Sequence, residues 1–302
     1  MSLKKLLLEA KQVNAPIRNV SQQRASLEAL AQMTSIVAGT SLTPTSLAGL
    51  VAEIVEPANI SSDRWLLYLH GGAYTAGSIA THRALVSRIC EKFGGRAIMP
   101  EYRLAPENPF PHGLDDALGA YLALLENVGN AQNIVLGGDS AGGGLVLGLM
   151  VRARAMGIAL PDRFFLISPW TDLTGDSRSV VERADSDPFL NAANLVPAAS
   201  LYLDGQDPRN PLASPLFADL SNLPPSLVLV GTDEILYDDS EHLVAKLQMC
   251  GSATRLIVGE GMWHVWPAFP MIPESGEAIA EIAAFIEHRD YSKAQNTRSE
   301  AM

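Results

Sequence analysis

The sequence predicts an α/β protein built on a mainly parallel sheet with helices packed on both faces. Short apolar runs alternate along the chain with helical patterns of about 10–15 residues, which is typical of this class. Glycine, serine, histidine and acidic residues come directly after several of the apolar runs. Because parallel strands end at the same edge of a sheet, we expect the functional site at the carboxyl ends of the strands.

The size and net charge of the chain indicate which classes of binding partner are expected. Its 302 residues are enough for one large α/β domain, and 47% hydrophobic with 18% charged residues is ordinary for a globular protein with a large core. The net charge of −11 is spread without long acidic blocks. This argues against nucleic acids and anionic membrane surfaces as partners, and it does not bear on a neutral small-molecule substrate.

The two cysteines, Cys90 and Cys250, lie far apart in helical patterns and form neither a disulfide framework nor a metal-ligand spacing. We therefore expect reduced thiols, which favour the cytoplasm, and the esterase mechanism predicted below requires no metal or organic cofactor. The apolar run at 6–8 is too short for a signal peptide. No stretch reaches the roughly 18–20 apolar residues that cross a bilayer, so no membrane insertion is expected.

Taken in order, the chain begins with two helical patterns within 1–40, which we place outside the sheet, and a break at 39–44. The expected strands are 50–55, 65–69, 96–100, 133–136, 163–167, 227–230 and 254–258. The expected helices are 80–93, 113–127, 145–156, 239–250 and 273–288. The predicted organisation is cap helices in 1–45, a catalytic domain in 46–290 with a cap insertion at 175–215, and a polar tail in 291–302.

The pattern Gly-x-Ser-x-Gly from Gly138 to Gly142 stands between an expected strand and an expected helix. In that setting it is the nucleophile elbow of an α/β-hydrolase. The glycines are needed because a Cβ two residues before or after Ser140 would clash with neighbouring backbone. The turn holds Ser140 Oγ above the sheet edge and places the Ala141 N–H at a helix start, where unpaired donors can bind an anion. The alternative is an incidental serine in a glycine-rich turn.

The run HGGAY at 70–74 follows a strand that we expect to be buried. A carbonyl attacked by a serine becomes an oxyanion and needs preorganised N–H donors, each worth roughly 2.7–4 kcal/mol in comparable enzymes. Small residues let the backbone approach the substrate, so we assign the N–H groups of Gly72, Ala73 and Ala141 to an oxyanion hole. His70 is expected to shape the loop through hydrogen bonds.

A serine hydroxyl needs a general base within hydrogen-bond reach to become a nucleophile. His82, His242 and His288 fall in or beside helical patterns, and we expect them on the surface. His264 lies in a loop after a late strand and follows the candidate acids in the order serine, acid, histidine. We therefore assign His264 as the base.

Three acids, Asp233, Glu234 and Asp238, follow the expected strand 227–230. An acid at this place can hold the imidazole in the required tautomer and stabilise the imidazolium. The chemistry alone does not choose between Asp233 and Glu234, and a spare acid on this turn can equally cap the helix that follows.

Four segments together resemble the hormone-sensitive-lipase family of carboxylesterases, known as bacterial family IV. They are HGGA at 70–73, EYRLAPE at 101–107, GDSAGG at 138–143 and the late acid–histidine pair. The resemblance runs from about Leu66 to Val265. It implies an α/β-hydrolase fold, with a mainly parallel eight-stranded sheet and a helical cap, and esterase activity on short acyl chains.

Carried over residue by residue, the resemblance makes Ser140 the nucleophile, His264 the base and the N–H groups of Gly72, Ala73 and Ala141 the oxyanion donors. The usual third glycine of the first motif is Ala73, a mild change.

The two other departures concern acids. The usual Asp before Tyr102 is Glu101, for which we expect a structural role. The family acid stands in Asp-Pro-Leu-x-Asp, and aligning Leu236 and Asp238 with the last part of that motif puts Glu234 at the catalytic position. The register favours Glu234, and Asp233 stays an alternative.

These residues predict a serine carboxylesterase that hydrolyses short- to medium-chain acyl esters through an acyl-enzyme. An amidase, peptidase or lactonase with the same triad is an alternative, as is a ligand receptor like the plant gibberellin receptors, which would be expected to have lost the base. Family analogy also suggests a homodimer through the last strand and helix. Four side chains either line the substrate pocket or belong to the core: Trp170, Phe189, Leu212 and Phe217.

Overall fold

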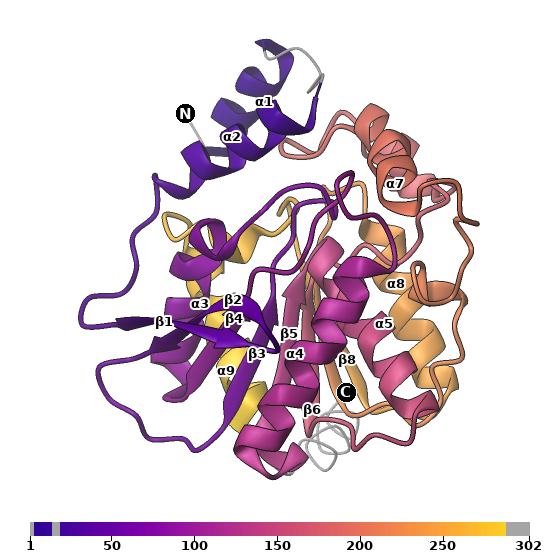
Figure 1. Cartoon of the computed structure of the whole chain (residues 1–302). Helices are drawn as coiled ribbons and strands as arrows, with labels where there is room; N and C mark the ends of the chain where they lie inside the picture. The colour runs from indigo at the N-terminus through magenta and orange to yellow at the C-terminus, as the bar shows by residue number, and fades with distance from the viewer. Residues whose placement is uncertain (1–2, 14–18, 288–302) are drawn as a thin grey trace, which may run out of the picture.

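The computed structural model describes residues 3–13 and 19–287, in which a central sheet is covered by helices on both faces (Figure 1). The strands are β1 (Ser41–Leu47), β2 (Leu50–Glu56), β3 (Trp65–Leu69), β4 (Arg96–Pro100), β5 (Ile134–Asp139), β6 (Arg163–Ile167), β7 (Ser226–Gly231) and β8 (Thr254–Gly259). They form one sheet in the order β1-β2-β4-β3-β5-β6-β7-β8. The two pairings of β2 are antiparallel and the other pairings are parallel.

The helices are α1 (Leu3–Val13), α2 (Val20–Ala31), α3 (Ile79–Phe93), α4 (His112–Val128), α5 (Ala141–Ala155), α6 (Arg178–Glu182), α7 (Leu195–Leu203), α8 (Tyr237–Met249) and α9 (Pro273–Glu287). One apolar core lies between the sheet and α4, α5 and α8, and a second lies between the sheet and α3 and α9. Strands β5 and β7 are buried along their whole length, because helices cover both of their faces.

The predicted α/β class, the mainly parallel eight-stranded sheet and the order of its main elements are confirmed. One strand was missed: β1 occupies part of the segment that the sequence analysis took as a break, so the first residues of the sheet fall inside the range 1–45 assigned to cap helices. Pro44 lies within β1 and pairs with Glu53. A proline is tolerated there because β1 is an edge strand with a partner on one side alone.

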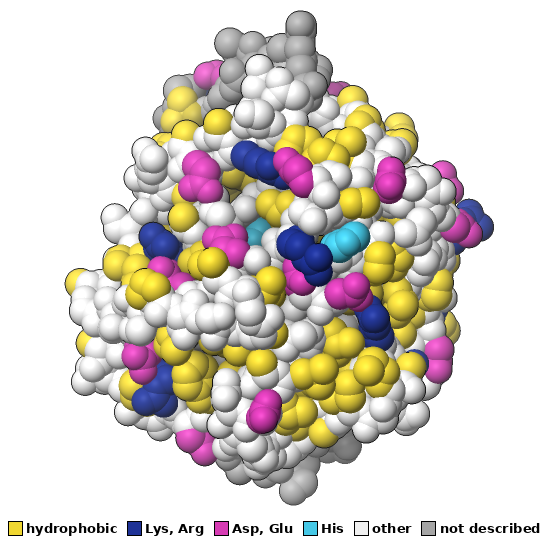
Figure 2. All heavy atoms as spheres, in the orientation of Figure 1, with side chains coloured by type: hydrophobic (Ala, Val, Ile, Leu, Met, Phe, Trp, Pro, Cys, Tyr) yellow, Lys and Arg dark blue, Asp and Glu magenta, His cyan; other side chains and the backbone are white. Residues whose placement is uncertain are grey.

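The two N-terminal helices lie together at one end of the molecule, with α7 at the same end (Figure 1). The segment 175–215 contains α6 and α7, which agrees with the one or two helices expected there, and its assignment as a cap insertion stays a prediction. The predicted tail 291–302 and His288 lie outside the described residues. No helix within the described ranges is long and apolar enough to span a bilayer. On the face drawn in Figure 2, acidic and basic side chains are interspersed, as expected from the spread of charge along the sequence.

Candidate active site

The turn between β5 and α5 has the backbone of a nucleophile elbow. Ser140 has φ 51° and ψ −123°, a conformation that a non-glycine residue holds only when its surroundings enforce it. Its N–H donates to the Ile167 carbonyl over 2.9 Å and its carbonyl accepts from the Trp170 N–H over 2.9 Å. A Cβ at Gly138 would lie 2.7 Å from the Gly142 carbonyl, and one at Gly142 would collide with backbone carbonyls after β3. The steric reason predicted for the two glycines is confirmed.

The loop after β3 has a left-handed backbone at three consecutive residues, with φ 124° at Gly72, 56° at Ala73 and 61° at Tyr74. Two N–H groups of the following turn donate to the Gly72 carbonyl, which closes the loop tightly. Within the described ranges, no backbone hydrogen bond uses the N–H groups of Gly72, Ala73 or Ala141. The lack of a backbone acceptor is what an oxyanion hole requires of its donors, and the role of these three N–H groups stays a prediction.

Glu234 and His264 form a buried pair at the ends of β7 and β8. His264 Nδ1 lies 2.7 Å from Glu234 Oε2, and the two residues are 2% and 0% exposed respectively. The other carboxylate oxygen, Oε1, accepts from the Ser168 hydroxyl over 2.8 Å and from the Gly231 N–H over 2.5 Å. Ser168 Oγ also accepts from the Val265 N–H over 3.0 Å. Ser168 thus ties the acid turn to the histidine loop, and sequence reasoning had missed it.

Burial and charge act in opposite directions on His264. Burial alone disfavours the imidazolium, but the hydrogen bond and negative charge of Glu234 outweigh it and raise the pKa of His264 above its usual 6.5. Stabilising the imidazolium in this way is the role of the acid beside a general-base histidine.

The two other candidate acids point elsewhere. Asp233 forms an ion pair with Lys4 of α1. Asp238 accepts from the Ser179 N–H over 2.9 Å at the start of α6. Of the three acids, the structure brings Glu234 to His264 and ties the other two to peripheral helices.

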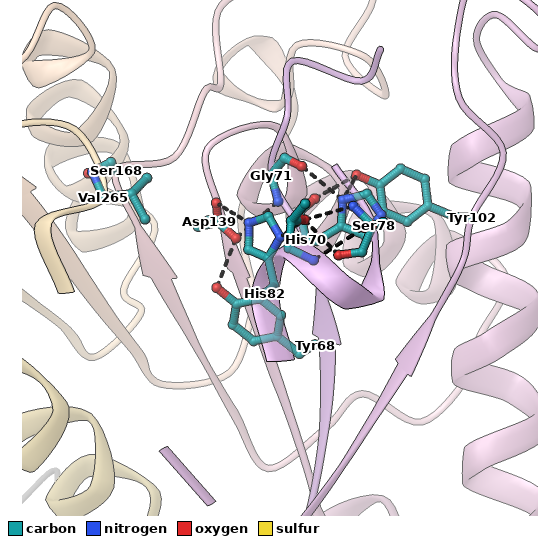
Figure 3. Close-up of polar contacts among 10 residues, drawn as sticks. Tyr68, His70, Gly71, Ser78, His82, Tyr102, Asp139, Ser168 and Val265 are labelled. Atoms are coloured by element: carbon teal, nitrogen blue, oxygen red, sulfur yellow. Dashed lines mark hydrogen bonds and ion pairs between the residues drawn. The ribbon is translucent and has the colours of Figure 1, made fainter. Parts of the chain in front are cut away.

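His82 does not lie on the surface, so this prediction was wrong. Its side chain is 13% exposed, and its Nε2 lies 3.2 Å from Asp139 Oδ2. Figure 3 shows Asp139 between His82 and Tyr68, with both side chains pointing at its carboxylate. The helical pattern located His82 in the first turn of α3 without indicating that this turn packs over the strand ends. Asp139 stands inside the elbow motif, and an acid ending a fully apolar strand was the signal that could have found the pair.

His70 has the hydrogen-bonding role that we expected. Its Nδ1 lies 2.8 Å from the Gly71 carbonyl, and its ring stacks on Tyr102 at 4.3 Å between centroids. Burial, followed by the neighbouring charge of His82, lowers the pKa of His70 to about 3, so the ring is neutral and Nδ1 carries the proton given to Gly71. Glu101, given a structural role from the sequence, accepts from the N–H at the first residue of α3 over 2.8 Å.

The N-terminal helices contact the rest of the chain through basic side chains. Arg24 of α2 donates to the Thr75 carbonyl over 2.8 Å and forms a bidentate pair with Glu107 at 2.7 and 2.9 Å. Lys11 of α1 donates to the Asp187 carbonyl over 2.6 Å. These contacts connect α1 and α2 to the 175–215 segment and to the loops after β3 and β4, and none of them is visible in a sequence pattern.

The four side chains proposed as pocket or core residues have different environments in the structure. Trp170 is buried against Tyr74, and Leu212 is half-buried against the core that contains α5. Phe217 is 39% exposed and lies under the Arg209 guanidinium. The Phe189 ring lies 6.1 Å from the His264 ring, which places it beside the candidate base. Within the described ranges, no cluster of three or more His, Cys, Asp or Glu side chains could hold a metal ion.

Comparisons with known proteins agree on one family. A family model described as alpha/beta hydrolase fold matches residues 66–268. The chain is 40% identical to an acetyl-hydrolase of Streptomyces hygroscopicus over 78% of this chain and 79% of that protein, and 36% identical to an esterase of Acinetobacter venetianus over 80% of each. The crystal structure of an esterase from the bacterial hormone-sensitive lipase family superposes with a TM-score of 0.90 at 37% identity, covering 95% of this chain and 98% of that one. The chain therefore belongs to the hormone-sensitive-lipase-like family of esterases with the α/β-hydrolase fold.

Proposed function

We propose that this enzyme is a serine carboxylesterase that hydrolyses short- to medium-chain acyl esters through an acyl-enzyme. The observation that carries the proposal is the buried 2.7 Å contact between Glu234 and His264, in loops after β7 and β8, at the same edge of the sheet as the strained elbow of Ser140. A serine on such an elbow, a histidine and an acid that orients the histidine are the groups that acyl transfer requires.

In the first step Ser140 Oγ attacks the ester carbonyl carbon, and His264 Nε2 takes the hydroxyl proton. The contact with Glu234 uses Nδ1, so Nε2 is the nitrogen left for the serine. In unliganded enzymes the contact between nucleophile and base is often long and tightens when substrate binds. His264 then gives the proton to the leaving alcohol, and the acyl group stays on Ser140.

The tetrahedral intermediate carries its negative charge on the former carbonyl oxygen. In the proposed mechanism this oxygen accepts from the N–H groups of Gly72, Ala73 and Ala141, which have no backbone acceptor within the described ranges. Donors that are already oriented cost no reorganisation during the reaction. In the second half-reaction His264 takes a proton from water, the hydroxide attacks the acyl carbonyl, and Ser140 regains its proton.

The acyl preference rests on the relatives and on one contact. The relatives include the acetyl-hydrolase described above and an ethyl acetate hydrolase of Pseudomonas putida, which is 35% identical over 66% of this chain. Phe189 stands beside His264 and supplies an apolar wall from the 175–215 segment. Together they favour a short- to medium-chain acyl group. We include the helices within 1–45 and the segment 175–215 in one shared cap over the active site.

A variant series tests the proposal with p-nitrophenyl acetate, butyrate and octanoate. Ser140→Ala and His264→Ala should each lower kcat by at least about 10³-fold with the fold intact by circular dichroism. His242→Ala, at an exposed position on α8, is the matched control and should keep wild-type turnover. Wild-type-like turnover in Ser140→Ala would overturn the proposal, and ligand binding without hydrolysis of any activated ester would favour the receptor alternative.

An ester, amide and lactone panel on the wild type then separates the esterase from an amidase or a lactonase.

Two further proposals concern the location of the protein and its oligomeric state. The free cysteines, one buried in α3, support a cytoplasmic location. Strand β8 forms one edge of the sheet, and a homodimer through β8 and α9 is testable by light scattering.

A further inference from the structure

Asp139 is a buried carboxylate directly before the nucleophile, and it takes part in no step of the proposed reaction. It is 3% exposed. Its Oδ1 accepts from the Tyr68 hydroxyl over 2.8 Å and from the Gly71 N–H over 3.0 Å, and its Oδ2 faces His82 Nε2 at 3.2 Å. Tyr68 and Gly71 both donate to Oδ1, and a proton on His82 Nε2 gives Oδ2 a donor as well, which is the arrangement that suits an ionised carboxylate.

The contacts of His82 provide a partner for each of its two ring nitrogens. Nε2 faces the Asp139 carboxylate, which can only accept. Nδ1 lies 2.7 Å from Thr81 Oγ1, and the Ser78 carbonyl lies 2.8 Å from the same oxygen, so the single hydroxyl proton of Thr81 can go to either of them. The same Oγ1 accepts from the Ser78 N–H over 2.9 Å and keeps one lone pair for His82. With the Thr81 proton on the Ser78 carbonyl, both ring nitrogens face acceptors, and a doubly protonated imidazolium satisfies both contacts.

The position of this ion pair gives it a consequence for the reaction. Asp139 reaches the oxyanion loop through the Gly71 N–H, one residue before the donor Gly72. The elbow serine follows Asp139 directly in the chain. A second negative charge forms beside these residues during ester hydrolysis, and an unpaired buried carboxylate would oppose it.

We propose that His82 is a positioning residue which, as an imidazolium, neutralises Asp139 behind the oxyanion hole and keeps its carboxylate aligned with the Gly71 N–H. The inference rests on the proposed esterase function for its catalytic consequence. The pair acts through Gly71 and does not touch the reacting atoms.

The surrounding groups agree with a charged His82. The carboxylate of Asp139 raises the pKa of His82 above its usual value despite burial, and the charge and hydrogen bond of His82 lower the pKa of Asp139 despite burial. The titratable groups that interact with the pair from neighbouring elements are Tyr68 on β3, His70 after β3, Glu101 and Tyr102 after β4, and His264 after β8. His70 is neutral, so it adds no second positive charge.

The first experiment is an NMR titration of the imidazole of His82 in the full-length protein, assigned with His82→Gln. We expect His82 to be doubly protonated at pH 7 and to lose a proton at lower pH in Asp139→Asn. A neutral His82 at pH 7 in the wild type would overturn the proposal. This readout does not depend on turnover, so it stands even if Ser140→Ala shows that the esterase mechanism is wrong.

The second experiment measures a charge rescue in four proteins: wild type, His82→Gln, Asp139→Asn and the double variant. The glutamine can still donate to Asp139 but leaves its charge unpaired. We expect His82→Gln to lower kcat for p-nitrophenyl butyrate by about tenfold, with KM changed by less than about threefold. A trifluoromethyl ketone, which mimics the tetrahedral oxyanion, should bind more weakly by the same factor.

In the double variant two neutral amides face each other, and no buried charge needs a partner. We expect it to recover most of the lost kcat, whereas a role in packing alone predicts losses that add. An additive double variant, or a loss in His82→Gln that appears in KM and not in kcat, contradicts the proposal. His242→Gln is the matched surface control.

Discussion

The imidazole of His264 meets the carboxylate of Glu234 at 2.7 Å, across two loops that lie 30 residues apart in the chain and are buried together. The bond uses Nδ1 and therefore sets the tautomer in which Nε2 can accept a proton. Asp233 is adjacent to Glu234 in the chain, yet it pairs with Lys4 instead. Two neighbouring acids thus have separate roles, and substitution can distinguish them.

The first prediction compares Glu234→Gln with Asp233→Asn. The amide at 234 should lower kcat for p-nitrophenyl esters by about 10²–10⁴-fold, because it neither fixes the tautomer nor stabilises the imidazolium. The amide at 233 loses a partly exposed ion pair and should leave kcat within about twofold of wild type. If Asp233→Asn had the larger effect on kcat, the triad assignment would pass to Asp233.

The second prediction concerns the acid limb of the pH profile. His264 must be neutral to act as a base, and its pKa is raised, so kcat/KM should fall with a midpoint above pH 6.5 as the pH is lowered. Glu234→Gln removes the hydrogen bond and the charge that raise this pKa. The midpoint of the acid limb in the variant's residual activity should therefore shift to a lower pH. An unchanged midpoint in the variant would show that another group sets the limb.

The same pKa shift has a counterpart in stability. A histidine with a raised pKa in the folded state stabilises the protein fully below its unfolded pKa near 6.5, and this contribution is lost as the pH rises through the folded value. The difference in Tm between wild type and Glu234→Gln should therefore shrink with rising pH across that window. Differential scanning calorimetry at a series of pH values measures it.

The third prediction tests the contact between α2 and the oxyanion loop. Arg24→Lys keeps the charge but cannot form the bidentate pair with Glu107 and the bond to the Thr75 carbonyl together. We expect a stability loss of about 1–2 kcal/mol and a drop in kcat/KM of about three- to tenfold. Arg178→Lys, in an exposed pair with Glu182 on α6, is the control and should change both by little. Equal effects of Arg24→Lys and Arg178→Lys on stability and kcat/KM would contradict the prediction that the contacts of α2 support catalysis.

The fourth prediction tests the close approach at the elbow. Gly142→Ala places a methyl group against backbone carbonyls that cannot move away, so we expect a loss of about 3 kcal/mol or more in stability, together with loss of turnover. Gly276→Ala in α9 meets no atom within 4 Å and should raise stability by about 0.5–1 kcal/mol. Chemical denaturation of both variants gives the comparison, and a stable, active Gly142→Ala would contradict the geometry.

The features that the sequence predicted well are those with a steric or periodic cause. Gly138 and Gly142 are required because the backbone passes too close for a Cβ, and the presence of glycine at both positions indicates this contact. The parallel strands are continuous apolar runs because both faces are covered. Glu234 was favoured by its register relative to Leu236, and the structure places it against His264.

The features that the sequence missed depend on which surfaces meet. His82 belongs to a clear helical pattern, but the pattern does not tell which strand ends the first turn of α3 covers. Arg24 meets its partners 51 to 83 residues away, and no local rule specifies such a contact. Strand β1 carries a proline and polar residues, so it lacks the apolar signal of an inner strand and is recognised through its pairing with β2.

The order of strands in the sheet has a consequence for how the enzyme acquires activity during folding. Ser140, Ser168, Glu234 and His264 follow β5, β6, β7 and β8, which are adjacent in space although their contacts span 30 to 97 residues of chain. Parallel pairing across such separations closes large loops and is slow compared with helix formation. On refolding, the helical signal should therefore return first and ester turnover last, which makes turnover a reporter of the completed sheet.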